Sequence, residues 1–296
     1  MQHSRRKDVM LCYPFEERRL IDPKFGWNFQ NGVMVQPKLD GIRATTRRNE
    51  DGQVVLISSE GNILHIPHIT DALEEMDFSF DLDGEIYSHG KSFEWICSRA
   101  KGSYGDTKEL QYHVFDAWTQ EPVAFKFRTK VIDNLFQGQT NWGIDYVVQK
   151  VPTTELFSTD SSLMLDFVSE MLNDYTNKSY EGIILRCPLG LYEMKRSRFI
   201  MKFKPSKTDC YRIVGIEQAC TMEGKPKGMV GAFIVQAPDS PQQFKISAGR
   251  FTHAERTEMW EQFPLGKWLE FQYQNKTAKD DFRMAFGLKI KEDFSG

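Results

Sequence analysis

Short apolar runs separated by polar turns predict β-strands through the first two thirds of the chain. These runs cover residues 33–35, 54–58, 78–87, 112–118, 183–185 and 200–204. Residues 44–46 and 54–58 flank the turn-like sequence NEDG at 49–52, which predicts a β-hairpin. The pattern therefore predicts a mainly β structure with a few helices for the first two thirds of the chain.

Helical spacing of apolar residues occurs at residues 69–76, 125–138 and 161–175. Ser161 or Ser162 is suited to cap the third helix, because a hydroxyl oxygen can accept from the first free backbone N–H groups. The expected apolar stripe of this helix consists of Leu163, Phe167, Met171 and Leu172.

A change of pattern at residues 205–209 predicts a linker and a second domain. Four strand-like runs follow, together with one helical stretch at 252–262. The runs cover residues 211–217, 231–236, 244–247 and 267–274. About five strands and one helix in roughly ninety residues favour a small β-barrel of the OB type. We therefore expect domains at residues 1–205 and 206–296.

Composition is ordinary for a globular protein, with 40% hydrophobic and 27% charged residues. The net charge is −3, so any DNA-binding surface must be a local patch. The five cysteines lack CxxC spacing and are expected to be reduced thiols of a cytoplasmic protein. Apolar runs stay below the roughly 18–20 residues of a membrane span, and the basic N-terminus does not resemble a signal peptide. We expect a monomer without membrane contact.

Residues 36–43 read QPKLDGIR and carry the most informative chemistry in the chain. They place the amine of Lys38 near a carboxylate, a glycine and an arginine. A neutral lysine amine can attack phosphorus when an anionic phosphate is held beside it. Taken alone, the pattern is equally compatible with an ordinary charged surface turn.

Five further segments give this lysine a context. They are residues 83–87 (DGEIY), 114–116 (VFD), 180–186 (YEGIILR), 195–197 (KRS) and 201–204 (MKFK). In order and spacing, the set resembles the covalent nucleotidyltransferase superfamily of ATP-dependent DNA ligases, RNA ligases and mRNA capping enzymes. Within it, the chain is most similar to minimal virus- or phage-type ATP-dependent DNA ligases. The resemblance extends from about Val33 to Asp293.

The resemblance implies an α+β protein. An ATP-grasp-like nucleotidyltransferase domain with antiparallel sheets and flanking helices would precede an all-β OB-fold barrel. It also implies sealing of nicks in duplex DNA, through AMP on Lys38 and then a DNA-adenylate, in DNA replication, repair and recombination. An RNA ligase or an mRNA capping guanylyltransferase of the same superfamily remains the alternative.

The resemblance also suggests roles in catalysis. Lys38 would attack the α-phosphorus of ATP. Lys202 and Lys204 alternate along one strand and so share a face. They would hold the α-phosphate and, together with Mg²⁺ or Mn²⁺, lower the pKa of Lys38.

Cofactor contacts follow from the same resemblance. Glu85 would bind the ribose, while Glu181 and Asp40 would serve at the metal. Glycines beside both glutamates are expected to let the ligand approach the backbone. The remaining contacts would be Phe115 stacking on adenine, Gln36 reaching the adenine edge through its side chain or main chain, and Arg43 and Arg196 contacting ribose or phosphate.

Two segments depart from the family pattern. Glu60 stands where many DNA ligases carry an arginine for the 5′-phosphate of the nick, so Arg47 or Arg48 would have to replace it. The C-terminal segment is rich in lysine where arginine is usual, so Lys289 or Lys291 would orient the pyrophosphate; we assign Lys291. Because no long insertion follows Gly224, the basic residues 99–102 are expected to help clamp DNA.

Overall fold

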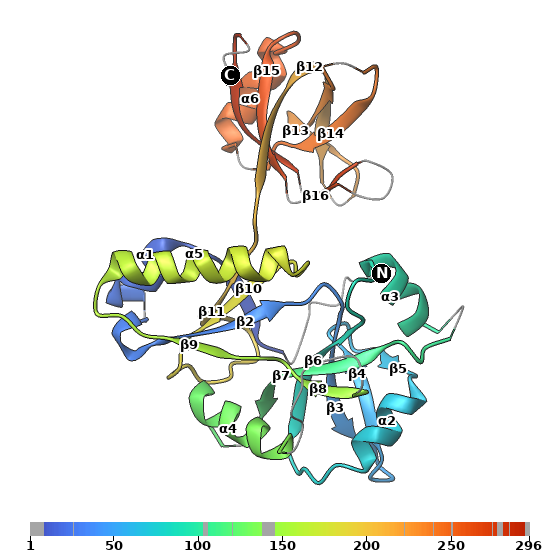
Figure 1. Cartoon of the computed structure of the whole chain (residues 1–296). Helices are drawn as coiled ribbons and strands as arrows, with labels where there is room; N and C mark the ends of the chain where they lie inside the picture. The colour runs from blue at the N-terminus through green and yellow to red at the C-terminus, as the bar shows by residue number, and fades with distance from the viewer. Residues whose placement is uncertain are drawn as a thin grey trace. The chain divides into compact units, whose positions relative to one another are not determined.

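The chain folds into two compact units, Met1–Lys204 and Pro205–Gly296 (Figure 1). The structure is a computed structural model. It describes residues 9–25, 27–102, 106–119, 121–137, 146–221, 223–238, 240–249, 251–273, 275–276, 281–283 and 285–293. The basic N-terminal residues 1–8, which bear on a signal peptide, lie outside the described residues. None of the described helices combines the length and apolarity that crossing a membrane requires.

A five-stranded sheet forms one half of the first unit. Its strands run in the order β1 (Leu11–Pro14), β11 (Arg196–Phe203), β10 (Gly182–Arg186), β2 (Val33–Lys38) and β9 (Thr154–Leu156). All its pairs are antiparallel except β1 with β11, which is parallel. The short helix α1 (Glu17–Ile21) and the long helix α5 (Ser161–Asn177) contribute Leu20, Met164 and Val168 to the core on this sheet.

The apolar stripe predicted for α5 is confirmed at Leu172, whereas Phe167 and Met171 are only partly buried. The buried side chains are Met164, Val168, Leu172 and Tyr175. Leu163 is 51% exposed. The cap is also one residue earlier than expected, because the Asp160 carboxylate accepts from the N–H groups of Ser162 and Leu163. A carboxylate at this position satisfies the same free donors as a serine hydroxyl.

A six-stranded sheet forms the other half of the first unit. Its order is β5 (Ile63–Leu64), β4 (Val54–Ser58), β3 (Ile42–Arg48), β6 (Asp81–Tyr87), β7 (Gln111–Trp118) and β8 (Val148–Lys150). The predicted hairpin is confirmed as β3 and β4. The helices of this half are α2 (Pro67–Glu74), α3 (Phe93–Ala100) and α4 (Phe125–Leu135). Each helix packs on the apolar core of this half through a buried isoleucine, namely Ile69, Ile96 and Ile132.

The second unit is a closed five-stranded barrel, as the sequence predicted. Its strands are β12 (Lys207–Cys220), β13 (Pro226–Gln236), β14 (Gln243–Ser247), β18 (Phe286–Lys291) and β15 (Trp268–Tyr273). The helix α6 (His253–Gln262) begins with a capping box between Thr252 and Glu255. A small hairpin joins β16 (Asn275–Lys276) to β17 (Phe282–Arg283).

Two details of the second unit differ from the sequence prediction. β12 begins at Lys207, so the linker is shorter than residues 205–209. The fifth strand of the barrel is β18, which comes from the lysine-rich C-terminal segment and pairs with β15. Its residues FGLKIK are mixed polar and apolar and mostly half-buried, so the apolar run is short.

Candidate active site

A cavity of about 190 Å³ lies in the first unit where strands of both sheets meet. It brings together seven residues that the sequence singled out, from five different strands. These are Gln36, Lys38, Arg43, Glu85, Phe115, Arg196 and Lys202. Lys38 ends β2 and pairs with Gly182 at the start of β10, which places Glu181 beside it.

Lys38 and Glu181 form the central contact of this site. Lys38 Nζ lies 2.6 Å from Glu181 Oε2, and Lys204 Nζ contacts the other carboxylate oxygen. The side chain of Glu181 is only 7% exposed, while that of Lys38 is 21% exposed. One buried carboxylate therefore holds two lysines from opposite sides.

The charges around Lys38 hold it in the ammonium form. Burial alone would lower the pKa of Lys38, but the carboxylates of Glu181 and Glu85 hold this pKa above its ordinary value. The expectation that neighbouring lysines lower the pKa of Lys38 is therefore wrong for this arrangement. The lysine whose pKa is lowered is Lys204, through burial and the charge of Lys38.

The pKa of Glu181 is shifted in the opposite direction to that of Lys38. Burial alone would raise the pKa of Glu181, but Lys38 and Lys204 hold it below its ordinary value. Lys202, on β11, lines the cavity itself, whereas Lys204 follows the end of that strand and points to Glu181. The two lysines thus serve different parts of the site.

Glu85 and Arg43 form a second charged group, on the six-stranded sheet. They stand opposite each other on β6 and β3. Arg43 Nε donates to Asp83 Oδ1 at 2.8 Å, and Tyr192 Oη donates to Asp83 Oδ2 at 2.6 Å. Burial raises the pKa of Glu85 to about 7, against the attraction of Lys38 and Arg43. Glu85 can therefore change charge near neutral pH.

The glycines beside the two glutamates have a role in the packing of the strands. A Cβ at Gly84 would lie 2.6 Å from His113 O, and one at Gly182 would lie 2.2 Å from Phe203 O. Both glycines make room for a neighbouring strand, and the close approach of a ligand at these positions stays a prediction.

Gln36 is committed to contacts within the protein. Its Nε2 donates to Phe115 O and to Thr153 Oγ1, both at 3.0 Å, while its Oε1 accepts from Arg186 Nε at 2.7 Å. The residue is only 2% exposed. Both amide hydrogens have acceptors, while Oε1 keeps one lone pair, so a side-chain contact with an adenine edge stays a prediction.

Sequence reasoning assigned no role to Arg186 or Arg128. Arg186 Nη1 donates to Asp116 Oδ2 at 2.6 Å, and Arg128 Nε donates to Asp116 Oδ1 at 2.7 Å. Burial alone would raise the pKa of Asp116, but the two arginines hold it below its ordinary value. The available signal was an arginine at the end of the apolar strand GIILR, where a buried charge needs a partner.

Phe115 lines the cavity between two guanidinium groups. The guanidinium carbons of Arg43 and Arg186 lie 5.4 and 5.5 Å from its ring centroid. The ring also packs against the core of the six-stranded sheet. A half-buried aromatic ring beside two cations can stack on a planar, electron-rich ligand.

Two predicted residues lie elsewhere. Asp40 does not line the cavity; its charge acts on Tyr87 and Cys97. Lys291 belongs to the second unit, where it forms an ion pair of 2.6 Å with Glu270.

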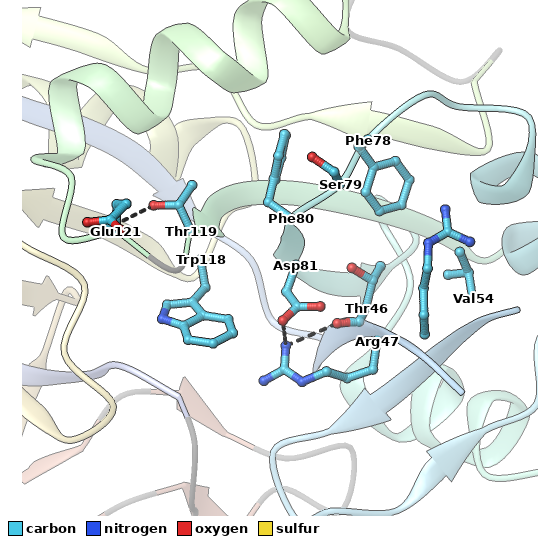
Figure 2. Close-up of a pocket in the computed structure, with 11 residues that line it drawn as sticks. Thr46, Arg47, Val54, Phe78, Ser79, Phe80, Asp81, Trp118, Thr119 and Glu121 are labelled. Atoms are coloured by element: carbon cyan, nitrogen blue, oxygen red, sulfur yellow. Dashed lines mark hydrogen bonds and ion pairs between the residues drawn. The ribbon is translucent and has the colours of Figure 1, made fainter. Parts of the chain in front are cut away.

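Arg47 and Arg48, which the sequence suggested in place of the arginine missing at Glu60, do not line this cavity. Glu60 is exposed in the turn after β4. Arg47 pairs with Asp81 at 2.5 Å and Arg48 with Glu74 at 3.3 Å. Both arginines instead line a second cavity (Figure 2).

The donor set near Lys38 suits a metal that takes few protein ligands. Among the described residues, no three His, Cys, Asp or Glu side chains gather as a complete metal cage would require. Glu181 Oε2 is buried and accepts no hydrogen bond of regular geometry from them, although Lys38 lies close. A single such carboxylate fits Mg²⁺, which is commonly held by one or two carboxylates together with substrate phosphates and water.

Comparisons with known proteins show which family both units resemble. The family described as "ATP dependent DNA ligase domain" matches residues 12–204, and the "DNA ligase OB-like domain" matches residues 223–291. The DNA ligase of African swine fever virus (isolate Pig/Kenya/KEN-50/1950) is 24% identical over 278 residues, which cover 88% of this chain and 63% of that protein. The DNA ligase of Haemophilus influenzae is 26% identical over 280 residues, covering 94% of this chain and 90% of the relative.

Solved structures show the same fold. One from a structure–function study of Lig E DNA ligases has a TM-score of 0.70 at 21% identity, covering 96% of this chain and 98% of that chain. Another, Pmar-Lig_PreS3, has a TM-score of 0.74 at 20% identity, covering 96% and 67%. The chain spans about 63% of the length of the swine fever virus ligases that it matches. The α+β fold with a nucleotidyltransferase domain and an OB-like domain is confirmed, and the chain belongs to the ATP-dependent DNA ligase family.

Proposed function

We propose that this protein seals nicks in duplex DNA with ATP, through AMP carried covalently on Lys38. The observation that carries the proposal is the Lys38 amine at the cavity, 2.6 Å from Glu181 and surrounded by Glu85, Arg43 and Lys202. Residues 1–205 would act as the adenylation domain and residues 206–296 as the OB-fold domain that holds DNA. The relatives reported above carry the name DNA ligase, which favours DNA over RNA ligation or capping.

The first step is attack of Lys38 Nζ on the α-phosphorus of ATP. The nitrogen–phosphorus bond forms, the bond to the β-phosphate oxygen breaks, and pyrophosphate leaves with the electron pair. Lys38 must first lose the proton that Glu181 and Glu85 stabilise. If Glu181 turns away from Lys38, burial and the charge of Lys204 remain to lower the pKa of the amine.

The other residues of the cavity would hold the nucleotide. Phe115 would stack on the adenine, and Glu85 would bind a ribose hydroxyl. Arg43, Arg196 and Lys202 would face the phosphates. Mg²⁺ or Mn²⁺, held by Glu181 with Asp40 as the second candidate, would supply positive charge to offset the triphosphate. Gln36 would position Phe115 through its bond to the Phe115 carbonyl oxygen.

The later steps need nicked duplex DNA. AMP would pass from Lys38 to the 5′-phosphate, and the adjacent 3′-hydroxyl would then displace AMP. The second unit offers Lys225, Lys227 and Lys245 as exposed cations for the DNA backbone.

Labelling with α-³²P ATP and Mg²⁺ tests the proposal. Wild-type protein should acquire covalent label, and Lys38→Arg should lose at least about a thousandfold of it, because arginine keeps the charge beside Glu181 but removes the nucleophile. Lys195→Arg, at an exposed lysine of the same unit, is the matched control and should label normally. Unlabelled wild-type protein, or labelled Lys38→Arg, would contradict the proposal.

Substrate choice is tested with the same preparation. ATP should label Lys38 in preference to GTP, and nicked DNA should be sealed in preference to nicked RNA. Preferential labelling by GTP would favour a capping guanylyltransferase. Preferential sealing of RNA would favour an RNA ligase.

A further inference from the structure

A second, larger cavity of about 650 Å³ opens on the first unit (Figure 2). Its walls come from the ends of β3, β6 and β7, the start of β4 and the segment before β6. Side chains of three kinds meet there: two arginines, two carboxylates and three aromatic rings. The residues that matter for its chemistry are Arg47, Arg48, Phe78, Phe80, Asp81 and Trp118. The proposed adenylation of Lys38 uses none of them, and the sequence suggested Arg47 or Arg48 only as a replacement contact to the 5′-phosphate of a nick.

The second cavity repeats an arrangement found in the first. In the first, Arg43 on β3 bonds Asp83 on β6 and lies 5.4 Å from the ring centroid of Phe115 on β7. The second has the same three parts on the same three strands, and the guanidinium carbon lies 5.6 Å from the ring. Its members are Arg47, Asp81 and Trp118.

Strand geometry places the arginines and carboxylates of both groups on one face of the six-stranded sheet, while Phe115 lies at an irregularity of β7. Arg43 and Arg47 are four residues apart on β3, so their side chains point to the same side, about 13 Å apart along the strand. Asp81 and Asp83 share a face of β6 for the same reason. Asp83 stands opposite Asp116 and Asp81 stands opposite Trp118, so β7 continues that face.

The second group keeps hydrogen-bonding capacity for a ligand. Arg47 uses Nη1 for both of its contacts, with Asp81 at 2.5 Å and with Thr46 O at 3.1 Å. A guanidinium carries five N–H donors, and Nε and Nη2 have no hydrogen-bond acceptor among the described residues, so they can donate to a ligand. Burial raises the pKa of Asp81 against the attraction of Arg47, so a donor from a ligand would offset part of its desolvation. Trp118 is half-buried and presents ring surface to the cavity (Figure 2).

We propose that the second cavity binds a nucleotide, with its base against Trp118 and its phosphate or base edge at Arg47. Aromatic rings stack on bases of any sequence, and arginine adds attraction for both ring and phosphate. An adjacent donor and acceptor, as Arg47 and Asp81 provide, match the polar edge of a base. The comparison with the first cavity rests on the proposed function, because Phe115 is taken there as the adenine-stacking ring. The nucleotide could be free or an unpaired member of a nucleic-acid strand.

Photo-crosslinking with 5-iodouracil tests the inference and separates these two sources. One arm uses 5-iodo-2′-deoxyuridine monophosphate, and the other a single-stranded oligonucleotide with one 5-iodouracil. Peptide mapping should place a cross-link on Trp118 or Phe80 in at least one arm. A cross-link from the mononucleotide indicates a free nucleotide, and one from the oligonucleotide alone indicates a strand. Absence of cross-links at both residues in both arms would overturn the inference.

Two variants of the full-length chain sharpen the result. Arg47→Met should lower the cross-link at Trp118 at least about fivefold, because the cation that orients the nucleotide is lost. Arg198→Met is the matched control: this exposed arginine lies 5.1 Å from the Phe199 ring, outside both cavities, and its loss should change nothing. Equal yields from the two variants would overturn the inference.

A third variant tests the same cavity independently, in case Arg47→Met does not fold. Trp118→Leu at this half-exposed position should weaken nucleotide binding about tenfold by fluorescence anisotropy. Unchanged binding would overturn the inference. Labelling of Lys38 with ATP is measured in the same samples. Labelling without a cross-link at the second cavity contradicts this inference alone, whereas a cross-link without labelling contradicts the proposed function alone.

Discussion

The two units of the chain differ in where their charged side chains lie. Within the described residues, every buried polar or charged side chain belongs to the first unit, including Asp83, Asp116, Arg128 and Arg186. The core of the barrel is apolar and aromatic, with Phe233, Phe244 and Phe271 among its members. Its ion pairs Lys245–Glu217 and Lys267–Glu292 are exposed, and the pair Lys291–Glu270 is partly exposed.

This difference indicates that the first unit carries the reactive groups, whereas the core of the second unit mainly stabilises the fold. Removing charges from water costs free energy that their mutual attraction often only just repays, so buried pairs are poor sources of stability. An apolar core stabilises without such cost. The first unit therefore keeps its charges for their positions around the cavity, and we expect it to be the unit more sensitive to substitution and to pH.

The largest expected effect follows from breaking the buried pairs at Asp116. Asp116→Asn leaves Arg128 and Arg186, whose side chains are 1% and 5% exposed, without their counter-ion. Removing one partner of a buried pair typically costs about 3–5 kcal/mol. We expect a loss of this size in the free energy of unfolding of the full chain, measured by urea denaturation.

Glu217→Gln in the barrel is the matched control. It makes the same carboxylate-to-amide change at the exposed Lys245–Glu217 pair. Surface pairs contribute below about 1 kcal/mol, so the expected change is small. Similar losses from the two substitutions would show that the contrast between the units does not govern stability.

The strands of the Lys38 site could be predicted because each carries a short local signal. Each of its strands contains a short apolar run that predicts a strand from local sequence alone. The residues in these runs are Lys38, Glu85, Phe115 and Lys202. The Asp116 pairs could not be predicted in this way, because they require α4 and β10 to meet β7. Arg128 and Arg186 come from segments that show no sequence relation to Asp116.

The next effect concerns pH. The pKa of Glu85 is raised to about 7 in the fold, above its ordinary value, so between roughly pH 4.5 and 7 the folded state binds more protons than the unfolded state. Stability should therefore fall as pH rises through this window. Glu85→Gln removes this ionisation, and its stability relative to wild type should rise by up to about 3 kcal/mol between pH 5 and pH 8.

Urea denaturation at several pH values measures this difference. Glu121→Gln, in the same unit but outside the Lys38 cavity, is the control and should show no such trend. A constant difference between Glu85→Gln and wild type from pH 5 to pH 8 would contradict the raised pKa of Glu85.

A narrower effect concerns the charge of Lys38 itself. Glu181→Gln removes the carboxylate that favours the ammonium form, while burial and Lys204 remain. The pKa of Lys38 should fall relative to wild type. Carbon-13 NMR of reductively methylated lysines measures this pKa, and Lys38→Arg assigns the signal. An unchanged pKa of Lys38 in Glu181→Gln would show that Glu181 does not hold the proton there.

The direction of this shift illustrates what local patterns leave out. Lys202 and Lys204 are near Lys38 in motif terms, so the sequence favoured a lowered pKa for Lys38. The pairing of β2 with β10 brings Glu181 within 2.6 Å of the amine, from about 140 residues away in the chain. Which charge lies closest depends on that register, and two short motifs read separately do not contain it.

The smallest expected effect tests the only predicted cofactor residue in the barrel. Glu270 forms an ion pair with Lys291 and raises its pKa. If Lys291 orients the pyrophosphate, Glu270→Gln should free its charge and speed labelling of Lys38 by about twofold, while Lys291→Met should slow it. The rate of α-³²P ATP labelling measures both.

Glu292→Gln provides the comparison, because it releases Lys267 from an exposed pair in the same barrel. Equal rates for Glu270→Gln and Glu292→Gln would remove the argument for Lys291 at the pyrophosphate. The dependence on salt separates charge from packing. Screening at about 0.5 M salt should shrink an electrostatic gain, since the Debye length then falls below about 5 Å. A gain that persists at this salt concentration would instead point to repacking of β15 against β18, and the role of Lys291 would then rest on the Lys291→Met result alone.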